Sequence, residues 1–121
     1  MIRGGTEMIL GFHRDPQVGP AVLLGHGGIT AEVFGDTAVR LLPVREHDAR
    51  AMIDEIKSGE LLKGFRGRPL ADVDALVAAL LAFARMAEAL GDRLIEAEIN
   101  PLVVRPAGEG VAAVDGLILL R

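Results

Sequence analysis

Apolar residues near the N-terminus fall into short runs that predict strands. Residues 6–12 read T-E-M-I-L-G-F, and residues 20–25 read P-A-V-L-L-G. The segment between them, H-R-D-P-Q-V-G, is charged and rich in turn formers, so it predicts a connecting loop. A third strand is expected over residues 38–42, where Pro43 would end it.

The middle of the chain has the periodicity of helices instead. Apolar residues recur every three or four positions over residues 45–56 and again over residues 72–90, and Gly91 is a C-terminal stop for the second helix. Residues 61–69, L-L-K-G-F-R-G-R-P, predict a basic loop between them. Strands at both ends and helices in the middle indicate an α+β fold, a mostly antiparallel sheet with helices on one face.

Near the C-terminus, polar side chains alternate with apolar ones over residues 96–104, E-A-E-I-N-P-L-V-V. The period of two directs Glu96, Glu98 and Asn100 to one face of a strand. A glycine-rich turn over residues 106–110 predicts a hairpin that brings Asp115, on the next apolar segment, near Asn100. Oxygen ligands of this kind suit Mg²⁺.

Asp115 has two interpretations. It stands between V-A-A-V and G-L-I-L-L, where an unpaired buried charge would be costly and a bound cation would offset that cost. In the alternative interpretation, the acids lie on an ordinary solvated strand face, and Asp115 only begins a turn at Asp115-Gly116.

A second candidate site is the glycine-rich stretch L-G-H-G-G-I over residues 24–29. Glycines let a backbone approach a ligand closely and expose N–H groups that bind phosphates, so Gly27 and Gly28 are candidate phosphate contacts. The alternative is a plain tight turn after a strand. The stretch lacks the spacing of a P-loop and that of a dinucleotide-binding fold.

Composition narrows the class of protein. The chain has 121 residues, enough for a single domain over residues 1–121, with no internal repeat. A net charge of −4, four Phe and neither Tyr nor Trp argue against a nucleic-acid partner. The absence of cysteine removes disulfide and thiolate chemistry. No apolar run is long enough to cross a bilayer and no signal-peptide pattern is present, so a cytoplasmic protein with no membrane contact is expected.

Four segments in order carry a family resemblance: G-G-T-E-M-I-L-G-F-H-R-D-P-Q-V-G-P, G-H-G-G-I-T-A-E, L-L-K-G-F-R-G, and E-I-N-P-L-V-V with a later V-D. Together they resemble the ATP-grasp domain of ADP-forming acyl-CoA synthetases, the superfamily that includes the succinyl-CoA synthetase β subunit. The resemblance covers nearly all of residues 3–120. More specifically, the resemblance is to the C-terminal subdomain, which is the second half of that domain.

The resemblance implies an acid–thiol ligase in which a carboxylic acid, CoA and ATP give acyl-CoA, ADP and phosphate through a phosphohistidine. ATP would lie between two subdomains, of which this chain supplies one. The family's metal ligands map to Asn100 and Asp115, which would bind the Mg²⁺ that bridges the nucleotide phosphates. Glu98 is a neighbouring candidate, although many relatives carry Asp there. Gly27 and Gly28 would face the phosphate or the phosphohistidine segment.

Arg14 would clamp a phosphate through its forked donors. Lys63, Arg66 and Arg68 are further candidates for phosphate or CoA contacts, with a solvated loop as the alternative. His26 lies nearest the proposed phosphate site and is a candidate for phosphorylation, although relatives usually have another residue there. His13 and His47 are expected to be solvated, and the catalytic residues of the reaction are not identified by the sequence.

Half of an ATP-grasp fold is missing from these 121 residues, as are CoA-binding and acyl-binding domains. The expected partners are therefore those remaining domains, in the same chain or in a partner subunit, and the isolated chain is expected to be inactive. Two alternatives stay open: a stand-alone binding or assembly module, and a regulatory copy fused to an acetyltransferase.

Overall fold

The computed structural model describes residues 5–27, 36–56, 59–64 and 70–121. Six antiparallel strands form one sheet with the order β3-β2-β1-β4-β5, and β6 also pairs with β4. The strands are β1 (Thr6–Asp15), β2 (Gly19–His26), β3 (Thr37–Leu41), β4 (Leu94–Val104), β5 (Val111–Ala113) and β6 (Gly116–Leu120).

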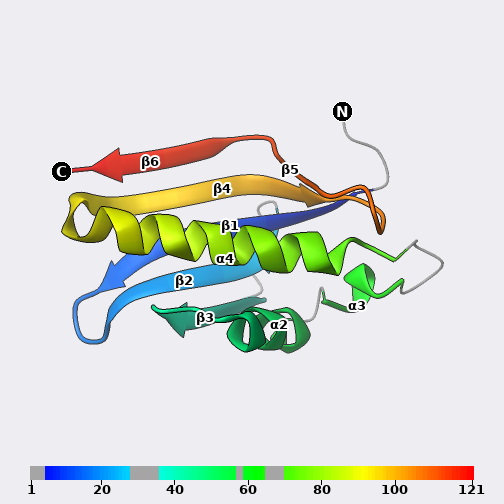
Figure 1. Cartoon of the computed structure of the whole chain (residues 1–121), viewed down its shortest axis with the longest axis horizontal. Helices are drawn as coiled ribbons and strands as arrows, with labels where there is room; N and C mark the ends of the chain where they lie inside the picture. Colours follow the sequence, from blue (N-terminus) through cyan, green and yellow to red (C-terminus); the bar gives the residue numbers. More distant parts are fainter. Residues whose placement is uncertain (1–4, 28–35, 57–58, 65–69) are drawn as a thin grey trace.

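The helices lie on one face of this sheet. They are α2 (Glu46–Glu55), the short α3 (Gly59–Leu62), α4 (Val73–Leu90) and the 3₁₀ turn η2 (Gly91–Arg93). Figure 1 shows α4 lying over the sheet, along the direction of its strands, and α2 lying beside β3. The predicted α+β architecture, an antiparallel sheet with helices on one face, is confirmed. No helix among the described residues combines the length and apolar character needed to cross a membrane.

The core lies between the sheet and the helices, chiefly α4 and α2. Met8, Leu10 and Phe12 alternate along β1 and are almost fully buried, as the period of a strand requires. They belong to one cluster with Leu76 and Leu80 of α4. The residues between them on β1 point to the opposite face.

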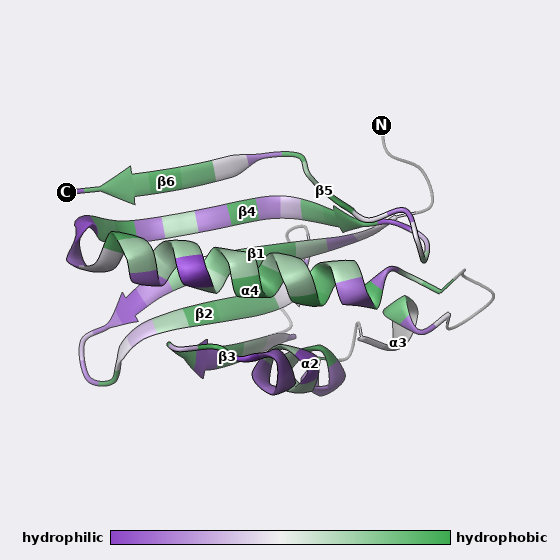
Figure 2. Ribbon diagram, viewed as in Figure 1, coloured by the Kyte–Doolittle hydropathy of each residue, from purple (hydrophilic) through white to green (hydrophobic). Residues whose placement is uncertain are grey.

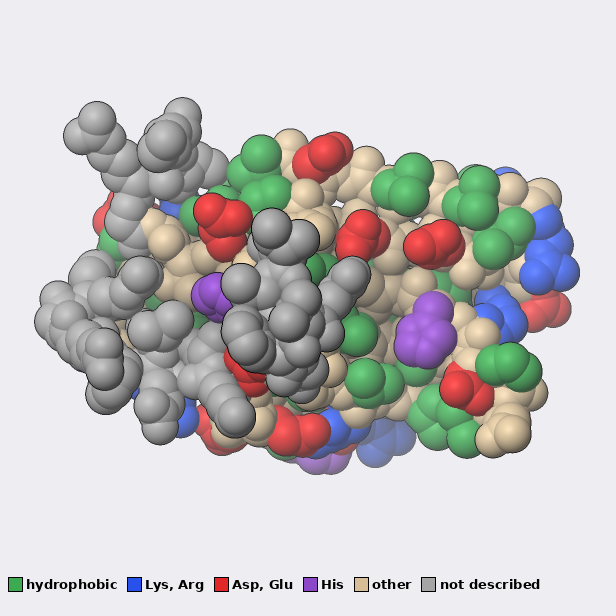
Figure 3. Space-filling model, turned by 180° about the vertical axis from the view of Figure 1, so that it is seen from behind, with side chains coloured by type: hydrophobic (Ala, Val, Ile, Leu, Met, Phe, Trp, Pro, Cys, Tyr) green, Lys and Arg blue, Asp and Glu red, His purple; other side chains and the backbone are tan. Residues whose placement is uncertain are grey.

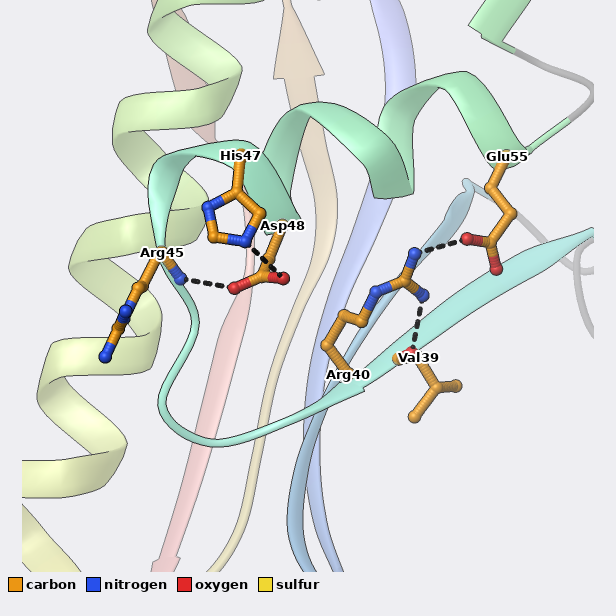
Figure 4. A network of polar contacts seen from close by, with 6 residues as sticks. All are labelled: Val39, Arg40, Arg45, His47, Asp48 and Glu55. Atoms are coloured by element: carbon orange, nitrogen blue, oxygen red, sulfur yellow. Dashed lines mark hydrogen bonds and ion pairs between the residues drawn. The ribbon is translucent and has the colours of Figure 1, made fainter.

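Polar contacts fix α2 beside β3. Arg40 of β3 forms an ion pair with Glu55 at the end of α2, and its guanidinium also donates to the Val39 carbonyl (Figure 4). At the other end, the Asp48 carboxylate accepts from the Arg45 N–H at 3.0 Å and lies near His47. His47 is exposed, as expected from the sequence.

Two element boundaries differ from the sequence prediction. β1 continues to Asp15 instead of ending at residue 12, because β2 pairs with it up to the turn, where the Asp15 carboxylate accepts from the Gln17 and Val18 N–H groups. The predicted loop over residues 61–69 begins inside α3, which extends to Leu62. The rest of that prediction, residues 65–69 with Arg66 and Arg68, lies outside the described residues.

The predicted hairpin across residues 106–110 forms, but its second arm is divided. β5 pairs with residues 102–104 of β4, and β6 pairs with residues 94–99. Opposite β1, the pairing of β4 shifts by one residue, so that Asn100 and Pro101 both lie opposite Ile9. This is the pattern of a β-bulge, a device that changes the direction of a side chain locally.

Candidate metal and nucleotide site

The candidate site occupies the sheet face that no described helix covers. Figure 3 views this face and shows acidic side chains gathered over it, close to the hydrophobic residues of one edge. A groove of about 280 Å³ crosses it. The groove is lined by residues from four neighbouring strands: Ile9, Gly11, Phe12, His13, Leu23, Gly25, Thr37, Glu96, Ala97 and Glu98.

The groove floor follows from the alternation of the strands. Gly11 of β1 lies opposite both Leu23 of β2 and Glu98 of β4, and residues paired across antiparallel strands point to the same face. Glycine at positions 11 and 25 leaves the floor open where side chains would otherwise stand. This groove was not predicted from the sequence, because the alternating apolar positions of β1 indicate a groove only when the pairing partners of the strand are known.

The three predicted metal ligands lie together at one end of this face. Glu98, Asn100 and Asp115 line a hollow of about 60 Å³ with Gly116 and Leu117. The Asn100 N–H donates to the Asp115 carbonyl at 3.1 Å, so the two residues are cross-strand neighbours, as predicted. In the described part of the chain, no hydrogen bond or ion pair occupies the Glu98 carboxylate or the Asn100 carboxamide.

This donor set fits a hard cation. Two carboxylates and one carboxamide offer only oxygen, and Mg²⁺ typically uses one or two protein carboxylates and completes its shell with water and phosphate. The hollow is larger than the roughly 10–15 Å³ that a single water requires. No group of three or more His, Cys, Asp or Glu placed for metal binding occurs among the described residues.

Of the two interpretations of Asp115, burial is wrong and the solvated strand face is confirmed. Its side chain is exposed, and so are all five residues of β6. The Asp115 Oδ1 accepts from the following Gly116 N–H at 2.8 Å. The reason is that β6 is an edge strand, which α4 does not reach, so the apolar sequence around Asp115 does not enclose it. A cation is therefore not required to offset a buried charge, and the argument for a metal rests on the convergence of oxygens.

Arg14 lies apart from this hollow. Its Nη2 donates to the Gly91 carbonyl at 3.1 Å and to the Leu94 carbonyl at 3.0 Å, and the guanidinium lies 5.6 Å from the centre of the Phe12 ring. The register places Arg14 five residue steps along the sheet from Asn100, about 16 Å away. The Arg14 side chain therefore binds main-chain carbonyls at the junction of α4 and β4.

Gly27 follows β2 and packs directly on β1. Its N–H donates to the Glu7 carbonyl at 2.7 Å, so this N–H is already used by the main chain. Gly28, the second glycine of the predicted phosphate turn, lies outside the described residues.

The histidines differ in their surroundings. The His26 side chain is half-buried, and its Nδ1 is shielded and has no hydrogen-bond partner among the described residues. His13 is exposed, as expected, yet it also lines the groove beside Glu96 and Glu98. Lys63 forms an ion pair with Asp54 at 2.9 Å, on the helical side of the molecule.

Known proteins resemble this chain over its whole length. The ATP-grasp domain family matches residues 1–120. The β subunit of acetate–CoA ligase (ADP-forming) II from Pyrococcus furiosus is 41% identical over all of this chain, which covers 51% of that subunit. The 4-hydroxybutyrate–CoA ligase (ADP-forming) of Nitrosopumilus maritimus is 35% identical over 95% of the chain, which covers 16% of that enzyme.

A solved structure shows the same arrangement of strands and helices. Acetyl-coenzyme A synthetase 1 of Candidatus Korarchaeum cryptofilum, in complex with coenzyme A and Mg-AMPPCP, superposes with a TM-score of 0.88 at 40% identity. The match covers 97% of this chain and 54% of that one. The chain thus spans about half the length of the subunits it matches, or less, and these relatives contain further domains. The chain belongs to the ATP-grasp domain family.

Proposed function

We propose that this chain is the C-terminal half of an ATP-grasp domain in an ADP-forming acyl-CoA synthetase. The observation that carries the proposal is the convergence of Glu98, Asn100 and Asp115 on one hollow of the sheet face that no described helix covers. Relatives named for ADP-forming ligation of acids to CoA support the reaction. In it, a carboxylic acid, CoA and ATP give acyl-CoA, ADP and phosphate through a phosphohistidine.

The residues of the chain have distinct tasks in this proposal. Asn100 and Asp115 would hold Mg²⁺, with Glu98 beside them. The ion neutralises charge on the nucleotide phosphates and orients them for transfer. Without a cation, Glu96 and Glu98 would repel a polyphosphate, so this face favours the metal-bound form of the nucleotide.

The remaining contacts belong to the groove and its rim. Ile9 and Leu23 offer apolar surface to the ligand, and the glycines at 11 and 25 allow it to approach the strand backbone. Gly27 and Gly28 remain the proposed phosphate-facing turn. Arg14 would act indirectly, since its bonds to Gly91 and Leu94 fix the start of the strand that carries Glu98 and Asn100.

The partners in this proposal are the other half of the ATP-grasp domain and the CoA-binding domains, in the same chain or in a second subunit. The protein would act in the cytoplasm, where ATP and CoA are available. A fractionation that placed it elsewhere would contradict this part of the proposal.

Asp115→Ala in the full-length enzyme tests the metal assignment. We expect ATP-dependent thioester formation to fall on the order of 100-fold, because charge stabilisation by the ion is lost at the phosphates. Asp92→Ala is the matched control, since Asp92 is also exposed but lies in η2, away from the hollow. Circular dichroism should show both variants folded. Unchanged turnover in Asp115→Ala would remove the metal assignment.

The isolated chain should bind Mg-ATP only weakly. It supplies one side of the site, and the contacts of the missing half with the base are absent, so most of the surface of the nucleotide would stay in water. Titration calorimetry with Mg-ATP should show no saturation at micromolar nucleotide. Tight binding would mean that the nucleotide site lies elsewhere on the chain.

A further inference from the structure

The outer edge of β6 has the character of an interface. Leu117, Ile118, Leu119 and Leu120 are between 41% and 55% exposed, on both faces of the sheet. Figure 2 shows β6 hydrophobic along most of its length, whereas its neighbour β4 alternates between polar and apolar residues. A strand that is apolar on both faces is typical of the interior of a sheet, not of its edge.

Half of the hydrogen-bonding groups of β6 point away from its own sheet. The Asp115 carbonyl accepts from Asn100 and the Arg121 N–H donates to the Arg93 carbonyl, so the odd-numbered residues bond to β4. Main-chain groups alternate in direction along a strand, so those of Gly116, Ile118 and Leu120 point outward. No described strand pairs with them. The Gly116 N–H is occupied by the Asp115 carboxylate, whereas those of Ile118 and Leu120 make no hydrogen bond to any described residue.

We propose that β6 pairs antiparallel with β6 of a second copy of this chain, about a two-fold axis at Ile118. In this register Ile118 lies opposite its own counterpart, and Leu120 lies opposite Gly116 of the second copy. All three outward-facing residues then lie opposite outward-facing residues of the other copy, which a two-fold axis at a neighbouring residue would not achieve. The sheets of two copies become one continuous sheet, a symmetric form of β-strand addition.

The charges at the ends of β6 select the same register. Positions that pair about Ile118 sum to 236, so Asp115 of one copy lies opposite Arg121 of the other. The symmetry repeats this pair at both ends. Directly opposite residues in antiparallel strands share a face, and opposite charges there are favourable. Between the charged ends, Leu117 lies opposite Leu119, so the remaining contacts are apolar.

The partner that pairs with β6 is therefore a second copy of this chain, because the strand complements itself in hydrogen bonding, apolar contact and charge. This inference does not rest on the proposed function, since it needs neither nucleotide nor metal. Edge strands of this kind are otherwise protected by charge, proline or a covering element, and residues 116–120 contain none of the first two.

Sedimentation equilibrium of the 121-residue chain, free of metal and nucleotide, tests the proposal. The sheet and its core are built from residues of this chain alone, so the chain can be studied by itself. We expect the mass to rise from 12.8 kDa to twice that value between micromolar and millimolar concentration. A chain that stays at 12.8 kDa throughout overturns the proposal.

Variants test the register. Ile118→Lys should abolish the dimer, because it places two like charges opposite each other at the axis. Leu70→Lys is the control, since Leu70 is 61% exposed but outside β6, and it should leave the dimer intact. Arg121→Glu should raise the dissociation constant about tenfold or more, through repulsion from Asp115. The double variant Asp115→Arg/Arg121→Glu should restore it, and a failure to do so overturns this register.

Hydrogen exchange of the unmodified chain gives a test that needs no variant. Protection of the Ile118 and Leu120 amides should increase with protein concentration. The amides of Leu117 and Leu119, which point toward β4, should be protected at every concentration. Fast exchange at Ile118 and Leu120 in concentrated protein would rule out the pairing.

Discussion

Gly27 shows at the scale of one residue why this sheet needs a glycine at the end of β2. A Cβ built at this position would lie 2.7 Å from the Glu7 main-chain carbon and 2.8 Å from its carbonyl oxygen. These are main-chain atoms of β1, which cannot turn aside as the end of a flexible side chain can. The same close approach allows the 2.7 Å hydrogen bond from the Gly27 N–H to Glu7.

Gly27→Ala should therefore destabilise the fold by about 1–3 kcal/mol, the usual cost of forcing a methyl group into filled space. Gly11→Ala is the control, because a Cβ there meets nothing nearer than 3.8 Å. Urea denaturation of the two variants gives the comparison. Equal midpoints for both would show that the end of β2 moves away from β1 without cost.

The candidate ligands could be predicted from the sequence, whereas the role of Arg14 could not. Alternation along residues 96–104 and the following glycine-rich turn were enough to place Asn100 beside Asp115. Arg14 instead donates to carbonyls that lie 77 and 80 residues away in the sequence. Main-chain acceptors leave no trace in the identity of a residue, so only the folded arrangement reveals such a contact.

At the scale of elements, Asp72 joins the start of α4 to the turn between β4 and β5. Its Oδ1 accepts from the Ala75 N–H at 3.1 Å, the usual bond of a helix N-cap. Its Oδ2 accepts from the Gly108 and Gly110 N–H groups at 3.1 and 2.8 Å. The bond from Gly110, followed by that from Ala75, lowers the pKa of Asp72 below its ordinary value of 3.8.

Acidic pH should therefore weaken the start of α4 and the turn between β4 and β5 together. Because the pKa of Asp72 is lower in the folded state, its contribution to stability is complete above pH 3.8 and is lost as the pH falls through the folded value. We expect Asp72→Asn to be less stable than the unmodified chain at neutral pH and to lose less stability on acidification.

Urea denaturation between neutral and acidic pH measures the effect. Asp92→Asn is the control, since its side chain makes no hydrogen bond in the described part of the chain. It should keep the pH dependence of the unmodified protein. A parallel pH dependence for Asp72→Asn would show that the carboxylate does not couple the helix to the turn.

Most elements were predictable because their periodicity is strong, but their ends were not. α4 was expected over residues 72–90 and spans Val73–Leu90. The division of the last strand into β5 and β6 was missed, since the apolar residues on both sides of Asp115 were read as one segment. The bulge at Asn100 and Pro101 was also missed, because it depends on the register against β1.

At the scale of the whole molecule, the fold class followed from the sequence, whereas the strand order and the exposure of β6 did not. β1 and β4 are central neighbours although they lie some 80 residues apart, and no local pattern encodes that pairing. The apolar character of β6 predicted burial, yet the strand is exposed in the single chain. A local pattern specifies that a residue should be covered without specifying what covers it.

The groove on the sheet face has a consequence for ligand selectivity. Its floor consists of strands whose backbones are paired with one another, so it keeps one shape whether or not a ligand is present. A floor that is preorganised in this way adds little ordering cost on binding, but it also cannot tighten around one ligand in preference to another. Selectivity between ligands must then come from the part of the protein that covers the groove. In the enzyme proposed above, exchanging that covering part for that of a related enzyme should transfer the ligand preference, while this chain stays unchanged.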